Sequence, residues 1–311
     1  MQVPKEQVTI ILPTLNEEKA IGPVIDELQT LGYTNIIVVD GHSTDNTTEI
    51  AESKGAKVIT QEGRGKADAI KTAVEHVKTP YMLIMDADYT YDPRHINHMT
   101  ELAPKYDEVI GVRATGRENI PTINRLGNKI LTIFFNLLFG TNVKDICSGM
   151  YLIKTEIAKG VWYESNGFSI EMELAAHVAS TTRKITDVDI NYRPRKGKQK
   201  LRKLHGLQIA LDAIKLAWGY NPTFIIFIIG ALTLIPANII LAYVAYELIF
   251  NGVNHHIWAI IGVNLAGIGI ISLLLSIMTL FIKRVEYRIN EKLERFNQAI
   301  RRNINTTEID H

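Results

Sequence analysis

The sequence predicts an α/β fold with a Rossmann-like, mostly parallel sheet and helices on both faces, followed by a hairpin of two transmembrane helices. Three observations predict it. Apolar, strand-like runs alternate with helical patterns over the first 200 residues. Polar and glycine-rich stretches follow the first strands, and the composition turns strongly apolar near residue 222. Strands that are apolar throughout and separated by helices are typical of parallel sheets covered on both faces.

Five strands and three intervening helices are expected in this first part of the chain. The strand runs are short and rich in β-branched residues, whereas the helical patterns are longer and amphipathic. The expected strands are Val8–Leu12, Ile36–Val39, Lys57–Thr60, Tyr81–Met85 and Glu108–Val112, and the expected helices are Glu17–Leu31, Asn46–Lys54 and Lys66–Val77.

Two long apolar runs occupy the C-terminal part. Thr223–Phe250 carries one charge, Glu247, and Ile257–Ile282 carries none. Each exceeds the roughly 20 residues needed to cross a bilayer core. Because only the short loop Asn251–His256 separates them, a buried soluble hairpin is the weaker interpretation. The sequence therefore predicts a transmembrane hairpin and a lipid bilayer as a partner.

The basic residues flank the outer ends of these spans and avoid the loop between them. They are Lys203, Lys215, Lys283, Arg284 and Arg288. The positive-inside rule then predicts a multi-pass protein of the cell membrane, with the N-terminal domain and both termini in the cytoplasm. The expected domains are residues 1–210 (catalytic), 203–220 (interfacial amphipathic helix or linker), 223–250 and 257–282 (spans) and 283–311 (charged tail).

The composition argues against a nucleic-acid-binding protein and against a disulfide-bonded protein. The net charge is +1, so no overall field favours nucleic acid. Cys147 is the single cysteine, which excludes an internal disulfide.

Two spans form a narrow membrane platform, a property compatible with a homo-oligomer.

The strongest motif follows the fourth expected strand. Asp86-Ala87-Asp88 places two carboxylates at the carboxyl end of Tyr81–Met85. Open α/β sheets bind ligands at that edge. Hard oxygen ligands suit Mg²⁺ or Mn²⁺, which usually accompany a diphosphate. An isolated Asp-x-Asp is more often an acidic turn, so the interpretation depends on the other strand ends.

Polar residues also end the first two strands. The first is followed by Pro13–Glu17, and Asp40 ends the second, where a ribose or a base would meet its carboxylate. Ser43 and Asp45 are more readily helix caps than ligand contacts. Lys66 begins a helix after a glycine-rich turn, where the macrodipole disfavours a cation. An anionic partner and a solvated lysine are equally open interpretations.

Six motifs in order resemble one family. They are Pro13–Glu17, Asp40–Asp45, Gly63–Lys66, Asp86–Asp88, Asp145–Gly149 and Arg195–Leu201. The chain resembles a family 2 glycosyltransferase of GT-A fold. It is most similar to the polyprenyl-phosphate type, which includes the dolichyl-phosphate mannose, glucose and N-acetylglucosamine synthases. The Asp40–Ser43 stretch resembles archaeal enzymes that use UDP-sugars.

The resemblance implies roles for the donor-side residues. It places Asp88 as the principal ligand of a Mg²⁺ or Mn²⁺ ion, with Asp86 and Thr90 beside it. Thr90 stands where mannose synthases often have glutamine, and its shorter reach leaves room for a water molecule. The implied nucleotide-binding residues are Pro13, Leu15, Glu17, Asp40, Lys66, Asp86 and Ala87.

The acceptor side is indicated by charge. Arginines precede an apolar segment, Ile130–Phe139, that is too short to span a membrane; a buried helix and an interfacial helix both remain open. A basic run, Arg193–Lys203, fits anionic lipid headgroups. The resemblance implies catalytic roles for Asp86, Asp88, Arg117 and Arg125. The implied acceptor-phosphate residues are Arg113, Arg117, Arg125, Lys129, Ser148, Arg193 and Arg195.

The expected reaction is that of a dolichyl-phosphate β-glycosyltransferase. It is a metal-dependent, inverting transfer of sugar from UDP-glucose, UDP-N-acetylglucosamine or, less favoured, GDP-mannose to dolichyl or polyprenyl phosphate. The product would serve protein glycosylation or cell-surface glycans. A hydroxyl acceptor is the alternative, and it needs a carboxylate base such as Asp145, Glu171 or Glu173. A third interpretation is a nucleotide-binding membrane protein that transfers no sugar.

Overall fold

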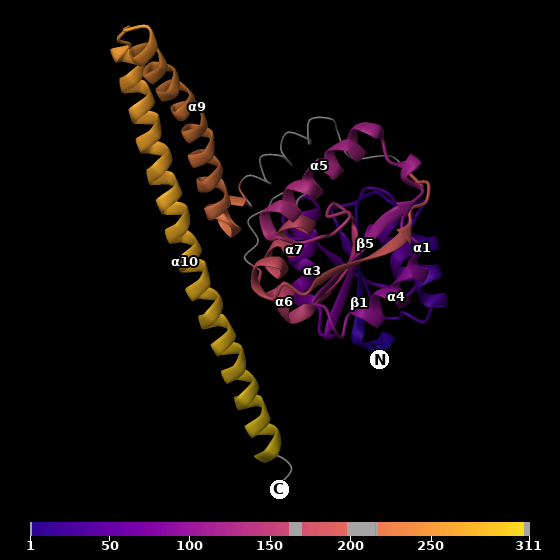
Figure 1. Cartoon of the computed structure of the whole chain (residues 1–311). Helices are drawn as coiled ribbons and strands as arrows, with labels where there is room; N and C mark the ends of the chain where they lie inside the picture. The colour runs from indigo at the N-terminus through magenta and orange to yellow at the C-terminus, as the bar shows by residue number, and fades with distance from the viewer. Residues whose placement is uncertain (1, 162–169, 198–214, 216, 308–311) are drawn as a thin grey trace. The chain divides into compact units, whose positions relative to one another are not determined.

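The computed structural model of the chain describes residues 2–161, 170–197, 215 and 217–307 (Figure 1). The chain divides into two compact units, Met1–Leu216 and Ala217–His311. The first unit holds the sheet and the candidate site, and the second consists of long apolar helices.

The first unit is built on a seven-stranded sheet of order β3-β2-β1-β4-β6-β5-β7. All neighbouring strands pair in parallel except β6, which is antiparallel to both of its neighbours. This confirms the mixed α/β class and the mostly parallel sheet. The strands are β1 (Val8–Thr14), β2 (Ile36–Asp40), β3 (Lys57–Thr60), β4 (Tyr81–Met85), β5 (Glu108–Thr115), β6 (Met150–Lys154) and β7 (Ile185–Asn191).

The reversed direction of β6 brings a distant loop to the end of β4. Met150, the first residue of β6, pairs with Met85, the last residue of β4. The loop Asp145–Gly149 therefore arrives at the sheet edge where Asp86 and Asp88 lie. Because β5 is parallel to β4, its carboxyl end with Arg113 reaches the same edge.

Helices cover both faces of the sheet. Figure 1 shows α3, α6 and α7 on one face and α1 and α4 on the other. The core between α1 and the sheet contains fully buried Ile10, Leu12, Ile25 and Leu28, whose removal from water stabilises the layer. The helices are α1 (Ile21–Thr30), α2 (Thr47–Ser53), α3 (Lys66–His76), α4 (Ile96–Leu102), α5 (Thr122–Phe139), α6 (Thr155–Lys159) and α7 (Ile170–Thr181), with short 3-10 turns η1 (Lys5–Gln7), η2 (Pro93–His95) and η3 (Arg117–Asn119).

The first helix begins four residues later than the sequence predicts. The backbone N–H of Glu17 donates to the hydroxyl of Thr47, and that of Glu18 donates to the carboxylate of Asp45. These bonds fix residues 17 and 18 as a turn against the start of α2, so the regular helix begins only at Ile21.

The second unit contains α9 (Pro222–Phe250) and α10 (His256–Thr307). Pro222–Phe250 and His256–Ile282 are long and apolar enough to cross a membrane, and only 11% of each most apolar window is buried. The two helices pack closely, since a Cβ atom on Gly269 would lie 2.4 Å from Leu234. α10 continues unbroken through most of the expected charged tail. The expected interfacial element at 203–220 lies largely outside the described residues.

Candidate active site

Asp88 is the most enclosed carboxylate at the end of β4. It is 6% exposed, and its Oδ1 accepts hydrogen bonds from the backbone N–H of Thr90 at 3.1 Å and from the Thr90 hydroxyl at 2.5 Å. Burial, and then the nearby charge of Asp86, raise the pKa of Asp88. Thr90 thus uses its hydroxyl proton to orient Asp88. A metal ion would bind the oxygen of that hydroxyl, so the metal contact that the resemblance implies stays a prediction.

Lys66 links Asp86 to a second carboxylate. Its Nζ lies 2.6 Å from Oδ1 of Asp86 and 2.5 Å from Oε1 of Glu171. Burial lowers the pKa of Lys66, but the charges of Asp86 and Glu171 together raise it well above its usual value. The other side of the Asp86 carboxylate lies against Gly149, where a Cβ atom would approach Oδ2 to 2.3 Å. Only glycine at 149 therefore admits this carboxylate position.

The ends of β1 and β2 lie next to each other, with Thr14 paired to Asp40. Asp40 is 5% exposed, and its carboxylate accepts a hydrogen bond from the Ser43 backbone N–H at 3.1 Å. Leu15 is 41% exposed at the same edge. Of the other expected nucleotide contacts, Glu17 and Ala87 are buried and Pro13 is half-buried.

Arg195 lies among the donor-side carboxylates. Its guanidinium is 2.8 Å from Oε1 of Glu17 and 3.2 Å from Oδ2 of Asp88. Arg193 pairs instead with Glu27 at 2.7 Å and Asp92 at 2.9 Å. The resemblance implied that both arginines bind the acceptor phosphate, whereas here both are engaged by acidic side chains.

Arg113, on β5, and Ser148, in the loop that precedes β6, are both buried. Arg113 donates two hydrogen bonds to Asp145 and a third to the carbonyl of Cys147. Ser148 is 1% exposed, and its hydroxyl donates to the carbonyl of Gly111. The bond of Ser148 uses its only donor, which argues against the expected contact of Ser148 with a phosphate. The bonds of Arg113 use three of its five N–H groups.

Arg117, Arg125 and Lys129 are exposed, on η3 and the first half of α5. Nε of Arg117 donates to the carbonyl of Arg113, which tethers this arginine beside the buried one. Arg125 contacts only the Thr122 hydroxyl within its own helix turn among the bonds that the structure describes. These three cations are thus available to an anionic ligand.

The exposed face of α5 is strongly apolar. Thr132, Phe135 and Leu138 face inward and are buried, while five large aliphatic side chains face outward. Their spacing of three and four residues places them on one helix face. The buried-helix interpretation of this segment is therefore wrong. This apolar stripe consists of Ile123, Leu126, Ile130, Ile133 and Leu137, each at least 56% exposed.

The charge balance of the site fits a divalent cation. Ion pairs link four carboxylates to two cations, Lys66 and Arg195, which leaves two formal negative charges. Within the described ranges, no three His, Cys, Asp or Glu side chains could jointly hold a metal. Mg²⁺ sites commonly use one or two carboxylates and complete their shell with substrate phosphates and water. The four carboxylates are Glu17, Asp86, Asp88 and Glu171.

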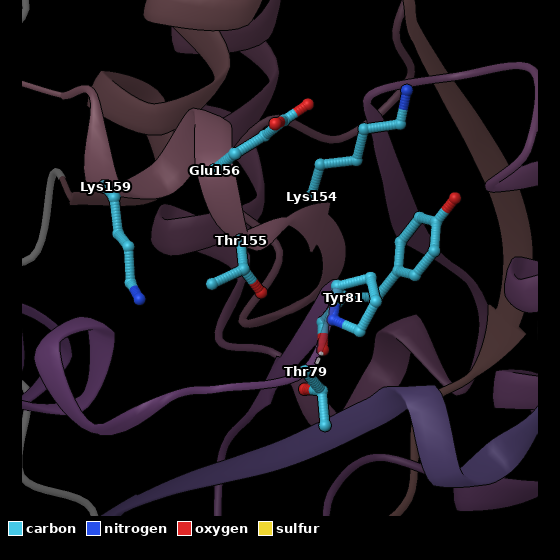
Figure 2. Close-up of a pocket in the computed structure, with 7 residues that line it drawn as sticks. Thr79, Tyr81, Lys154, Thr155, Glu156 and Lys159 are labelled. Carbon is cyan, nitrogen blue, oxygen red and sulfur yellow. Dashed lines mark hydrogen bonds between the residues drawn. The ribbon is translucent and has the colours of Figure 1, made fainter. Parts of the chain in front are cut away.

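One cavity lies at the opposite sheet edge, between the start of β4 and α6. It is lined by residues that include Tyr81, Thr155 and Lys159 (Figure 2). Its two lysines point away from each other and are already engaged, Lys154 with Asp107 and Lys159 with a backbone carbonyl. The five residues of β4, about 16 Å of strand, separate this cavity from Asp86. It is not part of the candidate active site.

Sequence reasoning missed the partner of Lys66 and the role of Tyr91. The hydroxyl of buried Tyr91 accepts a hydrogen bond of 2.6 Å from the N–H of Gly149. It thereby holds the glycine against Asp86. Neither the Lys66–Glu171 pair nor the tyrosine contact joins residues at a recognisable spacing.

The comparisons with known proteins identify the family of the chain. Residues 9–162 match the model of the family described as Glycosyl transferase family 2. Glycosyltransferase AglJ of Haloferax volcanii is 35% identical over 296 residues, 90% of this chain and 98% of that protein. The dolichyl-phosphate hexose transferase of the same organism is 34% identical over 206 residues, 65% of this chain and 89% of that protein.

A solved structure gives the same fold. Glucosyl-3-phosphoglycerate synthase of Mycobacterium tuberculosis, in complex with UDP, superposes with a TM-score of 0.57 at 21% identity, over 68% of this chain and 79% of that one. This likeness supports the GT-A architecture of the first unit. The family match over residues 9–162, together with the long match to AglJ, shows that the chain belongs to glycosyltransferase family 2.

Proposed function

We propose that this glycosyltransferase moves a sugar from a nucleotide-sugar to dolichyl or polyprenyl phosphate at a membrane surface. UDP-glucose and UDP-N-acetylglucosamine are the favoured donors, with GDP-mannose less favoured. The transfer depends on Mg²⁺ or Mn²⁺ and inverts the anomeric centre.

The donor assignment is supported by the carboxylates at the end of β4. Asp88 would hold the metal ion, with Asp86 fixed beside it by Lys66. The solved GT-A neighbours include complexes with Mn²⁺ and UDP-glucose and with Mg²⁺ and UDP. A relative at 34% identity is named for hexose transfer to dolichyl phosphate.

The apolar stripe of α5 is the observation that carries the acceptor assignment. Five exposed aliphatic side chains in water are costly, whereas the same face buried in a bilayer interface is stabilising. Arg125 and Lys129 lie on the same helix, and Arg117 lies just before it. A guanidinium binds phosphate oxygens bidentately. This arrangement suits an acceptor with an apolar tail and a phosphate head.

The chemistry follows from the charges of the acceptor and the leaving group. When bound, the metal ion supplies positive charge that stabilises the leaving diphosphate. Arg117 and Arg125 orient the acceptor phosphate, which is largely ionised at neutral pH and needs no base. A hydroxyl acceptor would need one, yet Asp145 is held by Arg113 and Glu171 by Lys66. A phosphate acceptor is therefore favoured over a hydroxyl.

The membrane arrangement is part of the proposal. The basic residues at the outer ends of α9 and of the span in α10 favour a cytoplasmic catalytic unit and cytoplasmic termini. In this arrangement, the catalytic unit lies on the cytoplasmic side of the membrane. It binds nucleotide-sugars from the cytoplasm, and α5 contacts the lipid headgroups of the same side. A homo-oligomer is compatible with it.

A donor panel tests the function. Full-length protein in proteoliposomes, Mg²⁺ or Mn²⁺ and a short polyprenyl phosphate are incubated with radiolabelled UDP-glucose, UDP-N-acetylglucosamine and GDP-mannose. We expect an organic-extractable, mild-acid-labile product from one donor, and none from Asp88→Asn protein or with EDTA. Transfer to a water-soluble or polymeric product would instead establish a hydroxyl acceptor. Nucleotide binding without sugar transfer to any acceptor would refute the transferase proposal.

A further inference from the structure

We infer, on the basis of the proposed function, that Glu171 is a positioning residue of the donor site. It acts through Lys66, whose ammonium it holds against Asp86, and it thereby sets the affinity for the nucleoside diphosphate. Among the bonds that the structure describes, the Glu171 carboxylate is bonded to Lys66 and not to Asp88, the proposed metal ligand. It comes from α7, whereas Lys66 and Asp86 come from α3 and from the end of β4.

The two carboxylates that pair with Lys66 differ in their exposure to solvent. The Asp86 side chain is 33% exposed, and an ion pair at that exposure is weakened by solvent. The Glu171 side chain is only 9% exposed and lies 2.5 Å from the same nitrogen. Because lysine carries its charge on a flexible four-carbon stem, one exposed partner would leave the ammonium loosely placed. Glu171, the buried partner, holds the ammonium of Lys66 in place.

The charges argue for a functional rather than a purely stabilising role. Two carboxylates share one ammonium, so the cluster carries one uncompensated negative charge. Removing ions from water is costly, and a buried pair is often no more stable than neutral residues of the same shape. Glutamine at 171 would accept the same hydrogen bond without that charge. A glutamate here is therefore explained by the precise placement of Lys66 and not by stability.

The position of Glu171 also joins the two halves of the site. It lies in the first turn of α7, and α7 packs against α5, the helix that carries the apolar stripe. Through the Glu171–Lys66 pair, α7, which packs against the proposed acceptor helix α5, is connected to Asp86 of the proposed donor site.

A double-mutant cycle on UDP binding tests the inference. The dissociation constant for UDP with Mg²⁺ is measured by calorimetry on full-length protein in detergent, for wild type, Glu171→Gln, Lys66→Met and the double variant. With Lys66 present, we expect Glu171→Gln to weaken UDP binding about tenfold, because the amide keeps the hydrogen bond to Lys66 but loses the charge that makes this bond about twice as strong. In the Lys66→Met background we expect a change below about twofold, because Glu171 then has nothing to position.

Thermal unfolding separates positioning from mere structure. We expect the midpoint of Glu171→Gln to stay within about 2 °C of wild type or to rise, since removing an excess buried charge is neutral or stabilising. Asp107→Asn is the matched control: this carboxylate is likewise buried and lies 2.5 Å from a lysine, Lys154, at the far end of the strands, and we expect its replacement to leave UDP affinity unchanged.

Three outcomes would overturn the inference. Equal weakening by Glu171→Gln in both backgrounds would show that it acts independently of Lys66. A lower unfolding midpoint with unchanged UDP affinity would show a purely structural role. Failure of wild-type protein to bind any nucleotide would refute the proposed function, and this inference with it. The first two outcomes leave the proposed function intact.

Discussion

The guanidinium of Arg113 donates two hydrogen bonds to the carboxylate of Asp145, one of 2.6 Å from Nε and one of 2.7 Å from Nη2. Both side chains are about one-tenth exposed, at 9% and 11%. The pair fixes the loop before β6 to the end of β5. That loop contains Gly149, against which Asp86 is placed, so the pair supports the position of Asp86.

Replacing Asp145 by Asn should lower the free energy of unfolding by about 3 kcal/mol, because Arg113 would remain as a buried, uncompensated charge. Denaturant unfolding of the detergent-solubilised protein measures the change. Lys54→Ala is the control: it breaks an exposed pair with Asp26 and should cost less than about 1 kcal/mol. Equal losses in the two variants would show that burial adds nothing to the Arg113–Asp145 pair.

Asp88→Asn should reduce sugar transfer by more than about 100-fold, since the site would lose charge stabilisation of the leaving group. The fold should persist, because the amide oxygen can still accept the hydrogen bonds from Thr90. Initial rates and the circular dichroism spectrum check both statements. Retained activity together with retained metal binding would remove Asp88 from its proposed role.

Arg117→Ala should raise the KM for polyprenyl phosphate about tenfold or more, the loss of a charge-assisted bond, while UDP affinity changes little. Arg117 is exposed and tethered to the backbone beside Arg113, away from the ion pairs of Lys66. Paired measurements of KM and of UDP binding test this. An equal loss of both affinities would move Arg117 to the donor side.

The apolar stripe of α5 should lie in the bilayer interface. A nitroxide attached at Ile133→Cys in proteoliposomes should be reached by oxygen more readily than by a water-soluble nickel chelate. The native Cys147 should not label, because burial raises the pKa of its thiol to about 12. Glu75→Cys, exposed on α3, is the control and should show the opposite preference. A similar pattern at both positions would contradict membrane contact by α5.

Glu108 should make the catalytic unit less stable as pH rises. Burial raises the pKa of this carboxyl from 4.5 to about 8, and its Oε2 has no hydrogen-bond partner in the described structure. Because the folded state keeps the proton that the unfolded state releases, this contribution is complete below pH 4.5. Above pH 4.5, the contribution of Glu108 to the free energy of unfolding falls by about 1.4 kcal/mol per pH unit until about pH 8. Unfolding of wild type and Glu108→Gln across this range tests the slope, and parallel curves would contradict it.

Strong local patterns made most of the fold predictable. The five expected strands and three expected helices all occur, although the first helix begins four residues late, because each is apolar or amphipathic over most of its length. β6 and β7 were not predicted. β7 is half-buried over its first three residues, and only Val188 and Ile190 are buried at this sheet edge. The reversed direction of β6 is a tertiary property that its own five residues do not encode.

The donor side was more predictable than the acceptor side. Asp86, Asp88 and Asp40 end strands, and strand ends are visible in a sequence. The partners of Arg113 and Arg195 are distant acids, and nothing in a run of basic residues distinguishes an arginine held by acids from one free for phosphate. Contact with ligands remains a prediction for all the expected site residues.

The length of α10 has a mechanical consequence. Its helix runs from His256 to Thr307, and the candidate span ends at Ile282. At 1.5 Å per residue, the 25 residues beyond that point form a rod of about 38 Å that is continuous with the span. A tilt of about 10° in the span would sweep the far end of the rod through about 7 Å. Changes in bilayer thickness would thus be transmitted by this helix to its far end as lateral displacement.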